Sequence, residues 1–453
     1  MQKRPQDDQG EAAPNQFRLL TKRRFLPLFC VQFLGAFNDQ VYQKAFIALI
    51  TYRLADTVDM SIAMLGVIAS ALFILPFAIV TPTAGQIADR VDKAKMTRVV
   101  KAWEIVVMGL AVVGYYTQNI AFLYFVLFLM GAQSAMFAPI KYGVLPQYLT
   151  RAELVGGNGL VQGSTFVAII FGTILGNELI LTEYGVAIVS TVVVMVAVAG
   201  FVASLFTLPA GPTGPAVPVD YVFPRAIYRL VARVARNRPA FRTMLSISWF
   251  WFLGATFLSL LPAYAKKILG ADEEVLTVLL AGFSVGVALG AISAERLCAR
   301  RGPVDIPPWG AVGMAVMAIE LWFATQAAAS PGEPLVGRET FFATATGWRV
   351  LVDFVVLATF AGIYVTPLNA LLQATAEAEA RAQYIAASNV VDSSFMVLSA
   401  VVVALLLAFG LGEDAILAML TLTGFPMALI VARHAPQTPI GRVALRLWPR
   451  GPG

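Results

Sequence analysis

A set of polar residues inside the first long apolar stretch of the sequence has the clearest potential for chemistry. The stretch runs from Phe25 to about Leu54 and is long enough to cross a bilayer as a helix. At about 100° per residue, one face of this helix carries only polar or small side chains, namely Gln32, Gly35, Ala36, Asp39 and Gln43. An acid near the centre of a membrane helix costs about 2.5–3.5 kcal/mol even on the translocon-insertion scale. Asp39 is therefore expected to lie in a transport path or, alternatively, to pair with a neighbouring helix in a purely structural role.

The composition indicates a helical membrane protein that crosses the bilayer many times. Of 453 residues, 58% are hydrophobic and only 13% are charged, and the mean hydropathy of +0.74 excludes an ordinary soluble protein. The first apolar run is not expected to be a cleaved signal peptide, because it is too long and contains Asp39 and Lys44. Hydropathy predicts about twelve spans, at 25–52, 61–84, 98–117, 120–140, 155–181, 185–208, 243–268, 275–297, 307–328, 348–373, 384–410 and 412–432.

The basic residues sort to one side of these spans. That side carries three groups of Lys and Arg at 22–24, 90–98 and 225–242, a fourth at 296–301, and the basic C-terminal tail. By the positive-inside rule both termini are cytoplasmic, which requires an even number of spans. The sequence pI of about 9.3 then reflects this orientation, and no nucleic-acid partner is expected.

The longest cytoplasmic connection follows the sixth span. It begins rich in Pro and Gly and continues with Arg225, Arg229, Arg233 and Arg236 on one helical face and apolar residues on the other. Such a basic amphipathic helix is expected to lie on the anionic inner leaflet, or alternatively to be a solvated linker helix. The predicted organisation is an N-terminal tail (1–24), a first six-helix half (25–208), the linker (209–240), a second half (241–433) and a basic tail (434–453).

Short strings recur in the same order in the two halves, about two hundred residues apart. The pairs are Phe33-Leu-Gly-Ala36 with Phe252-Leu-Gly-Ala255, Ala88-Asp-Arg90 with Ala294-Glu-Arg296, and Pro139-x-Lys141 with Pro367-x-Asn369. Together they indicate an internal duplication of the kind that transporters use, with a binding site at the interface of the repeats.

Polar groups at membrane depth in both halves are the candidates for that central cavity. The expected substrate-binding residues are Gln32, Asp39, Gln43, Lys44, Lys141, Asn369 and Gln373. Asp353, Asn389 and Asp392 are further polar groups at or near membrane depth. For each of these residues, a buried hydrogen bond without a substrate role is the alternative.

The loop after the second span, Gly85-Gln-Ile-Ala-Asp89-Arg90-Val-Asp92-Lys93, is similar to the loop signature of the major facilitator superfamily, with Asp92 in place of the usual glycine and Lys93 in place of the arginine. A glycine here permits close helix approach, and an acid at a helix end holds a basic cluster in one of two arrangements. The resemblance implies an all-helical fold of about twelve membrane helices in two pseudo-symmetric halves. The expected gating residues are Gly85, Asp89, Arg90, Lys93, Glu295 and Arg296, with a plain positive-inside anchor as the alternative.

A narrower resemblance rests on four strings: Gln32-Phe-Leu-Gly-Ala-Phe-Asn-Asp39, Ala138-Pro-Ile-Lys141-Tyr-Gly-Val-Leu-Pro-Gln147, Gly156-Gly-Asn-Gly-Leu160 and Thr366-Pro-Leu-Asn369-Ala-Leu-Leu-Gln373. They resemble the bacterial lysophospholipid transporter family, and Arg381-Ala-Gln-Tyr-Ile-Ala-Ala-Ser-Asn389 fits the branch fused to 2-acylglycerophosphoethanolamine acyltransferases. The resemblance implies alternating-access movement of lysophospholipids from the outer to the inner leaflet of the bacterial inner membrane, where they are reacylated. It implies no cofactor or metal, a monomer, and an acyltransferase or acyl-ACP synthetase as partner.

Two departures from the family pattern bear on the substrate. Gln40 stands where the family has Asn, and Thr256-Phe-Leu-Ser259 stands where the stand-alone transporters have a basic residue. A headgroup phosphate therefore needs another cation, for which Lys44 and Lys141 are the candidates.

Three alternative functions make different demands on the sequence. A facilitator that exports a drug or small polar solute would use Asp39 as a proton site. An acyltransferase of the same pathway would need a His-x-x-x-x-Asp pair, but the sequence has only His434, followed at the fifth position by Pro439, and it has no phosphate-binding loop for nucleotides. A membrane scaffold or receptor would not need ionisable residues at the midplane.

Overall fold

The computed structural model describes residues 15–54, 62–214, 219–328, 335–433 and 438–447, and this part of the chain is helical. Eleven of its helices are long and apolar enough to cross a membrane. Helix α1 (Leu26–Arg53) has 28 residues but is not among the eleven, because the polar residues from Gln32 to Lys44 interrupt its apolar character. Together these twelve segments confirm the predicted all-helical membrane fold.

The first half consists of α1 and five further helices: α2 (Ile62–Arg90), α3 (Lys93–Thr117), α4 (Ile120–Tyr148), α5 (Leu154–Leu181) and α6 (Gly185–Leu205). Helix α1 packs against α5 and α6, and α4 packs against α2 and α3. Two buried tyrosines join three of these helices, since Tyr42 donates to the Leu123 carbonyl oxygen at 2.8 Å and Tyr115 donates to the Tyr42 carbonyl oxygen at 3.0 Å.

The second half begins with α8 (Arg238–Ala263), which continues into a π-helical turn (Tyr264–Ile268), and α9 (Glu273–Arg301). It continues with α10 (Pro307–Ala328), the short α11 (Arg338–Phe342), α12 (Ala345–Thr375) and α13 (Arg381–Ala408). The last predicted span is broken at Thr423 into α14 (Glu413–Leu422) and α15 (Gly424–Ala432). At this break the Trp249 indole donates to the Thr423 hydroxyl at 2.9 Å.

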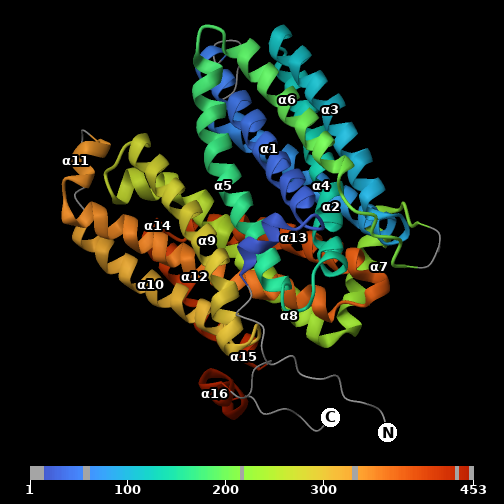
Figure 1. Ribbon diagram of the computed structural model, residues 1–453. Coiled ribbons are helices and arrows are strands. Elements are labelled where there is room, and N and C mark those ends of the chain that lie inside the picture. The colour runs from blue at the N-terminus through green and yellow to red at the C-terminus, as the bar shows by residue number, and fades with distance from the viewer. Residues whose placement is uncertain (1–14, 55–61, 215–218, 329–334, 434–437, 448–453) are drawn as a thin grey trace.

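The two halves meet at one end of the molecule and diverge toward the other (Figure 1). Between the halves, α5 packs against α9 and α2 packs against α13. Among the described residues, every hydrogen bond or ion pair that involves a side chain and joins helices of different halves lies where α2, α9 and α12 end and α5 and α13 begin. Because the Arg- and Lys-rich segments lie there, we call it the basic end.

Several helices are longer at the basic end than hydropathy predicted. Helix α2 continues to Arg90, α3 starts at Lys93 and α4 continues to Tyr148. The start of α3 is fixed by Asp92, whose carboxylate accepts hydrogen bonds from the backbone N–H groups of Ala94 at 2.8 Å and Lys95 at 3.4 Å. Hydropathy marks where the apolar side chains stop, whereas the helix ends are set by such caps.

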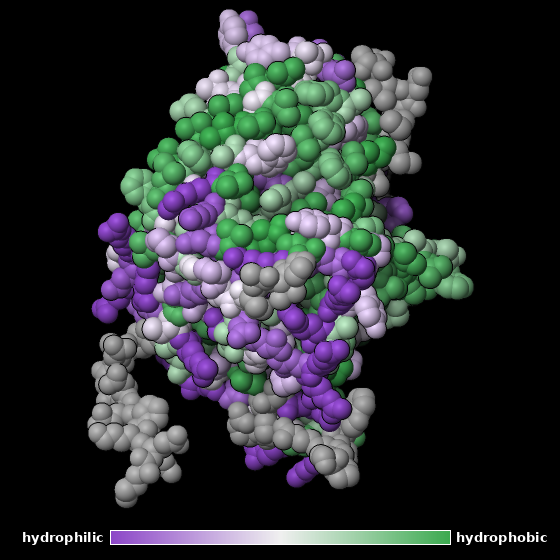
Figure 2. All heavy atoms as spheres, turned by 90° about the vertical axis from the view of Figure 1, so that its right-hand side faces the viewer, coloured by the Kyte–Doolittle hydropathy of each residue, from purple (hydrophilic) through white to green (hydrophobic). Residues whose placement is uncertain are grey.

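The linker helix α7 (Phe223–Arg236) corrects the expectation of a helix that lies on the inner leaflet. Its residues Ala226, Leu230 and Val234 are buried, and α7 packs against α2, α8 and α13. The apolar stripe of α7 is therefore covered by the bundle and is not left for lipid. On the side of the molecule that carries α7, apolar side chains cover the upper part and polar ones gather toward the basic end (Figure 2).

Candidate functional site

Asp39 lies within the first half, where α1 faces α4. The Ser134 hydroxyl on α4 donates to the Asp39 carboxylate at 2.6 Å. About two helical turns closer to the basic end, the Lys141 ammonium donates to the Gln32 side-chain oxygen at 3.0 Å, and the Gln32 amide donates to the Thr165 hydroxyl on α5 at 2.6 Å. The polar face of α1 is therefore tied to both α4 and α5.

A buried ion pair on α3, which sequence reasoning missed, supports this site. Lys101 Nζ lies 2.5 Å from Glu104 Oε2, and both side chains are buried. Glu104 also accepts hydrogen bonds from Asn38 at 3.0 Å and from Gln133 at 2.9 Å. The signal was present in the sequence, because opposite charges three residues apart inside a predicted span share one helix face.

An acidic group, Asp39, and a basic group, Lys141, lie about two helical turns apart between α1 and α4, and no ion pair joins them in the part of the chain that the structure describes. Lys101 forms an ion pair with Glu104, whereas the contacts of the Lys141 ammonium among the described residues are the Gln32 oxygen and the Tyr142 ring, whose centroid is 5.0 Å from Nζ. Both Asp39 and Lys141 are partly exposed. A cation and an anion held apart in this way can bind a ligand that carries both charges.

Asp89 closes the basic end by capping a helix of the other half. Its carboxylate accepts hydrogen bonds from the backbone N–H groups of Ala382 at 2.9 Å and Gln383 at 3.0 Å, at the start of α13. The helix dipole favours a negative charge at this position. Gly85 permits the close approach, because a Cβ atom there would lie 2.5 Å from the Ala386 Cβ and 2.9 Å from the Ala382 oxygen.

Glu295, at the matching position of the second half, takes part in a different contact. It accepts a hydrogen bond at 2.8 Å from the backbone N–H of Gln16, which belongs to a short 3-10 helix (η1, Gln16–Thr21) before α1. The Gln16 side chain donates to the Ile292 carbonyl oxygen at 2.7 Å. Nearby, Asn158 of α5 and Gln373 of α12 exchange two hydrogen bonds, at 3.0 and 2.7 Å.

This two-half architecture matches known proteins. Residues 28–400 match the family described as the Major Facilitator Superfamily. The chain belongs to the major facilitator superfamily. It is a membrane transporter, and it is similar to proteins named lysophospholipid transporter LplT: 27% identical to that of Serratia proteamaculans over 78% of this chain and 81% of the relative, and 27% identical to that of Citrobacter koseri over 94% and 95%.

Solved structures support the same fold. A bacterial homologue of the iron transporter ferroportin, in an outward-facing state, aligns over 90% of this chain and 98% of that chain with a TM-score of 0.64 and 14% identity. The fucose:proton symporter of E. coli aligns over 91% and 98% with a TM-score of 0.65 and 15% identity. At these identities the likeness shows the major facilitator fold alone.

The predicted substrate-binding residues of this major facilitator fall into three groups. Gln32, Asp39 and Lys141 lie together between α1, α4 and α5. Gln43, Lys44 and Asn369 are partly exposed, and no hydrogen bond of their side chains is found among the described residues. Gln373 is buried, and its amide is engaged with Asn158 at the contact between the halves. Their roles in binding remain predictions.

The predicted gating residues all lie at the basic end, but they differ in burial. Asp89, Lys93 and Glu295 are buried, and the Lys93 ammonium lies 4.0 Å from the Asp89 carboxylate and 3.1 Å from the Thr213 hydroxyl. Arg90 is partly exposed and Arg296 is exposed. His434 lies outside the described residues.

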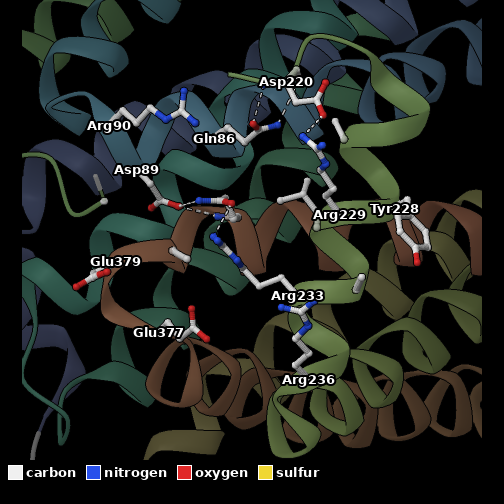
Figure 3. Close-up of a pocket in the computed structure, with 16 residues that line it drawn as sticks. Gln86, Asp89, Arg90, Asp220, Tyr228, Arg229, Arg233, Arg236, Glu377 and Glu379 are labelled. Atoms are coloured by element: carbon white, nitrogen blue, oxygen red, sulfur yellow. Dashed lines mark hydrogen bonds and ion pairs between the residues drawn. The ribbon is translucent and has the colours of Figure 1, made fainter. Parts of the chain in front are cut away.

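A cavity of about 460 Å³ lies between α7 and the start of α13 (Figure 3). Its lining includes Asp89, Arg90, Arg229, Arg233 and Gln383, and Arg233 donates to the Gln383 side-chain oxygen at 2.9 Å. At its edge Asp220 accepts hydrogen bonds from Arg225 at 2.8 and 2.9 Å and from Arg229 at 2.9 Å. The hydrogen bonds from Arg225 hold the pKa of the Asp220 carboxyl below its usual value. The linker is therefore fastened beside the Asp89 contact.

Proposed function

We propose that this transporter moves lysophospholipids from the outer to the inner leaflet of the bacterial inner membrane, where they are reacylated. The observation that carries the proposal is that an acid, Asp39, and a base, Lys141, lie between the same helices, and no ion pair joins them among the described residues. The names of the relatives support the lipid substrate.

In the proposed complex the ammonium of a lysophosphatidylethanolamine headgroup lies at Asp39 and its phosphate at Lys141. At an effective dielectric constant of about 20, a charge pair 4 Å apart is worth about 4 kcal/mol before desolvation is subtracted. Gln43, Lys44 and Asn369 are partly exposed and complete the polar surface. The single acyl chain stays against apolar helix surfaces and lipid.

We further propose that transport proceeds by alternating access. The described structure corresponds to the state closed at the basic end, held by Asp89, Glu295 and the Asn158–Gln373 pair. If the basic end is cytoplasmic, this state is open to the outside. The two halves then rock about the central site, the contacts at the basic end break, and the headgroup leaves toward the inner leaflet, where an acyltransferase partner acts on it.

The orientation is tested by cysteine labelling from outside the cell. A cysteine introduced at Gly337, at the end of the molecule opposite the basic end, should react with a membrane-impermeant maleimide, and one introduced at Ala232 on α7 should not. The reverse pattern would overturn the topology and with it the direction of transport.

The substrate is tested in proteoliposomes that contain a fluorescent lysophosphatidylethanolamine in the outer leaflet. Movement of the lysolipid out of the outer leaflet is measured as protection of its dye from dithionite, which quenches only the dye that it can reach. We expect the protein to speed the equilibration of the lysolipid but not of a diacyl phosphatidylethanolamine with the same dye. If the lysolipid equilibrated equally fast in liposomes with and without the protein, and the protein instead exported an amphiphilic drug, the substrate would be a drug or small polar solute.

A further inference from the structure

The carboxylate of Glu104 joins three helices of the first half. Its Oε1 atom accepts a hydrogen bond from the Asn38 amide on α1 at 3.0 Å. Its Oε2 atom accepts from the Gln133 amide on α4 at 2.9 Å and from the Lys101 ammonium on α3 at 2.5 Å. All four side chains are buried, and none is more than 2% exposed. Glu104 therefore does more than balance the charge of Lys101, because it also links α1 to α4.

The two residues that Glu104 holds through their amides are chain neighbours of the residues that form the Asp39 contact. Asn38 precedes Asp39 on α1, and Gln133 precedes Ser134 on α4. The Ser134 hydroxyl oxygen lies 2.6 Å from the Asp39 carboxylate and 3.1 Å from the Gln133 side-chain oxygen. These contacts close into a loop that leads from Glu104 along α1 to Asp39, across to Ser134 and back along α4.

Glu104 also sets the orientation of the Gln133 amide. An ionised carboxylate can only accept hydrogen bonds, so the nitrogen of the amide faces Glu104 and its oxygen faces Ser134. The Ser134 hydroxyl, which has a single proton, therefore lies between two acceptors, Asp39 and Gln133. When an ammonium group approaches Asp39, Ser134 can turn toward Gln133 and keep a hydrogen bond.

The polar face of α1 packs closely against the same ion pair. A Cβ atom at Gly35 would lie 2.5 Å from Lys101 Nζ, so a glycine at this position leaves room for the ammonium group. The Lys101 ammonium also lies 5.3 Å from the centroid of the Phe137 ring on α4. The Lys101–Glu104 pair is therefore enclosed between α1, α3 and α4, one helical turn of α1 from Asp39.

We propose that Glu104 is a positioning residue for headgroup binding, an inference that rests on the proposed function. Through Asn38 and Gln133 it holds α1 and α4 so that Ser134 binds one oxygen of the Asp39 carboxylate, Oδ2. No hydrogen bond to the other oxygen is found among the described residues, and that oxygen faces the substrate ammonium. Without the Glu104 contacts the substrate itself has to order the carboxylate, which weakens its binding.

The test removes one amide at a time and leaves the ion pair in place. Changing Glu104 itself would leave the buried Lys101 without its acid and would destabilise the fold whatever its role. Gln133→Met and Asn38→Leu each remove a single hydrogen bond to Glu104. The initial rate of lysophosphatidylethanolamine movement in proteoliposomes, measured at increasing mole fractions of the lysolipid, gives kcat and the half-saturating mole fraction, KM. The melting temperature in detergent reports the fold.

We expect each variant to raise KM by about two- to tenfold, the loss that corresponds to one hydrogen bond, with kcat and the melting temperature close to wild type. Because the two amides act in series, the double variant should raise KM no further than the single ones do, whereas independent contributions would multiply. Tyr124→Phe is the matched control, because it removes a hydrogen bond from α4 to the Leu65 carbonyl oxygen, outside this set of contacts. It should keep the wild-type KM.

Three results would overturn the positioning role and make Glu104 purely structural. They are an unchanged KM in the single variants, effects that multiply in the double variant, and loss of folded protein in the single variants. In each case wild-type protein still moves the lysolipid and the proposed function stands. If wild-type protein did not move the lysolipid at all, the proposed function itself would fail.

Discussion

The acids at the ends of α2 and α9 occupy matching positions in the two halves, but they close the basic end in different ways. Asp89 reaches across to the other half and caps α13 directly through two backbone N–H groups. Glu295 instead binds the backbone of Gln16, in the segment before α1. The first contact joins a helix of one half to a helix of the other. The second joins α9 to η1, the short helix before α1.

The packing at the two contacts is nevertheless alike. A Cβ atom at Gly85 would lie 2.9 Å from the Ala382 carbonyl oxygen, and one at Gly159 would lie 2.5 Å from the Ala291 carbonyl oxygen. In both places a glycine lets a helix of the first half touch the backbone of the second. The close packing is therefore common to both contacts, whereas the polar contacts differ: two backbone N–H groups donate to Asp89 and one donates to Glu295.

The largest effect is expected from Asp89→Ala. The change removes a helix cap worth about 0.5–2 kcal/mol and leaves the buried Lys93 without its acid. Breaking a buried ion pair in this way costs about 3–5 kcal/mol. We expect the basic end to open more often, measured as faster maleimide labelling of the buried Cys298 in a Cys30→Ser background, with reduced lipid transport.

Asp89→Asn is the matched control, because an amide still caps a helix but carries no charge. It should open the basic end less than Asp89→Ala does and should leave expression and stability in detergent close to wild type. If Asp89→Asn instead reduced the amount of folded protein, Asp89 would be a structural anchor, and its difference from Glu295 would say nothing about gating.

The next effect tests the similarity of packing. Gly85→Val and Gly159→Val each force a side chain against the backbone of the other half, and overpacking of this kind costs about 1–3 kcal/mol. Both should therefore speed Cys298 labelling to a similar extent. A large difference between the two would show that the contacts are not packed equivalently.

An effect of similar size is expected from Glu295→Ala, which removes a hydrogen bond to a charged acceptor worth about 1.5–3 kcal/mol. Because its partner is Gln16, removal of residues 1–21 should have a similar effect, and Glu295→Ala should add little to it. Additive effects of the two changes would mean that Glu295 acts through another partner.

The smallest effect concerns the linker beside the Asp89 contact. The pKa of Asp220 is lowered in the folded protein, so its contacts with Arg225 and Arg229 are fully present above the usual carboxyl pKa of 3.8 and are lost only as the pH falls through the lowered pKa. A spin label at Ala232→Cys should therefore keep its mobility from pH 8 to 4 and become more mobile only at a lower pH. Asp220→Asn should raise the mobility at pH 7; an unchanged spectrum would remove Asp220 from the linker's attachment.

The sequence predicted the helices and the internal repeat well, because hydropathy and short strings are local properties. It did not predict contacts between distant residues, such as the Asn158–Gln373 pair, which engages the amide of Gln373; the binding role of Gln373 stays a prediction. The linker helix was misplaced for a similar reason. An amphipathic pattern shows that one face is covered, but only the structure shows that protein, and not lipid, covers Leu230 and Val234.

Binding of the lipid headgroup by the side chains of Asp39 and Lys141 is tested by leaflet-resolved uptake of lysophosphatidylethanolamine with the Asp39→Asn variant. If Asp39 only pairs with Ser134, the amide keeps its size and hydrogen bonding, and uptake should survive. If it binds the ammonium, a net loss of even about 1.4 kcal/mol weakens binding about tenfold. We predict a normally folded protein that loses most uptake, with partial uptake by Asp39→Glu and a comparable loss in Lys141→Gln. Wild-type uptake by Asp39→Asn, in vesicles with matched protein content, would contradict the account.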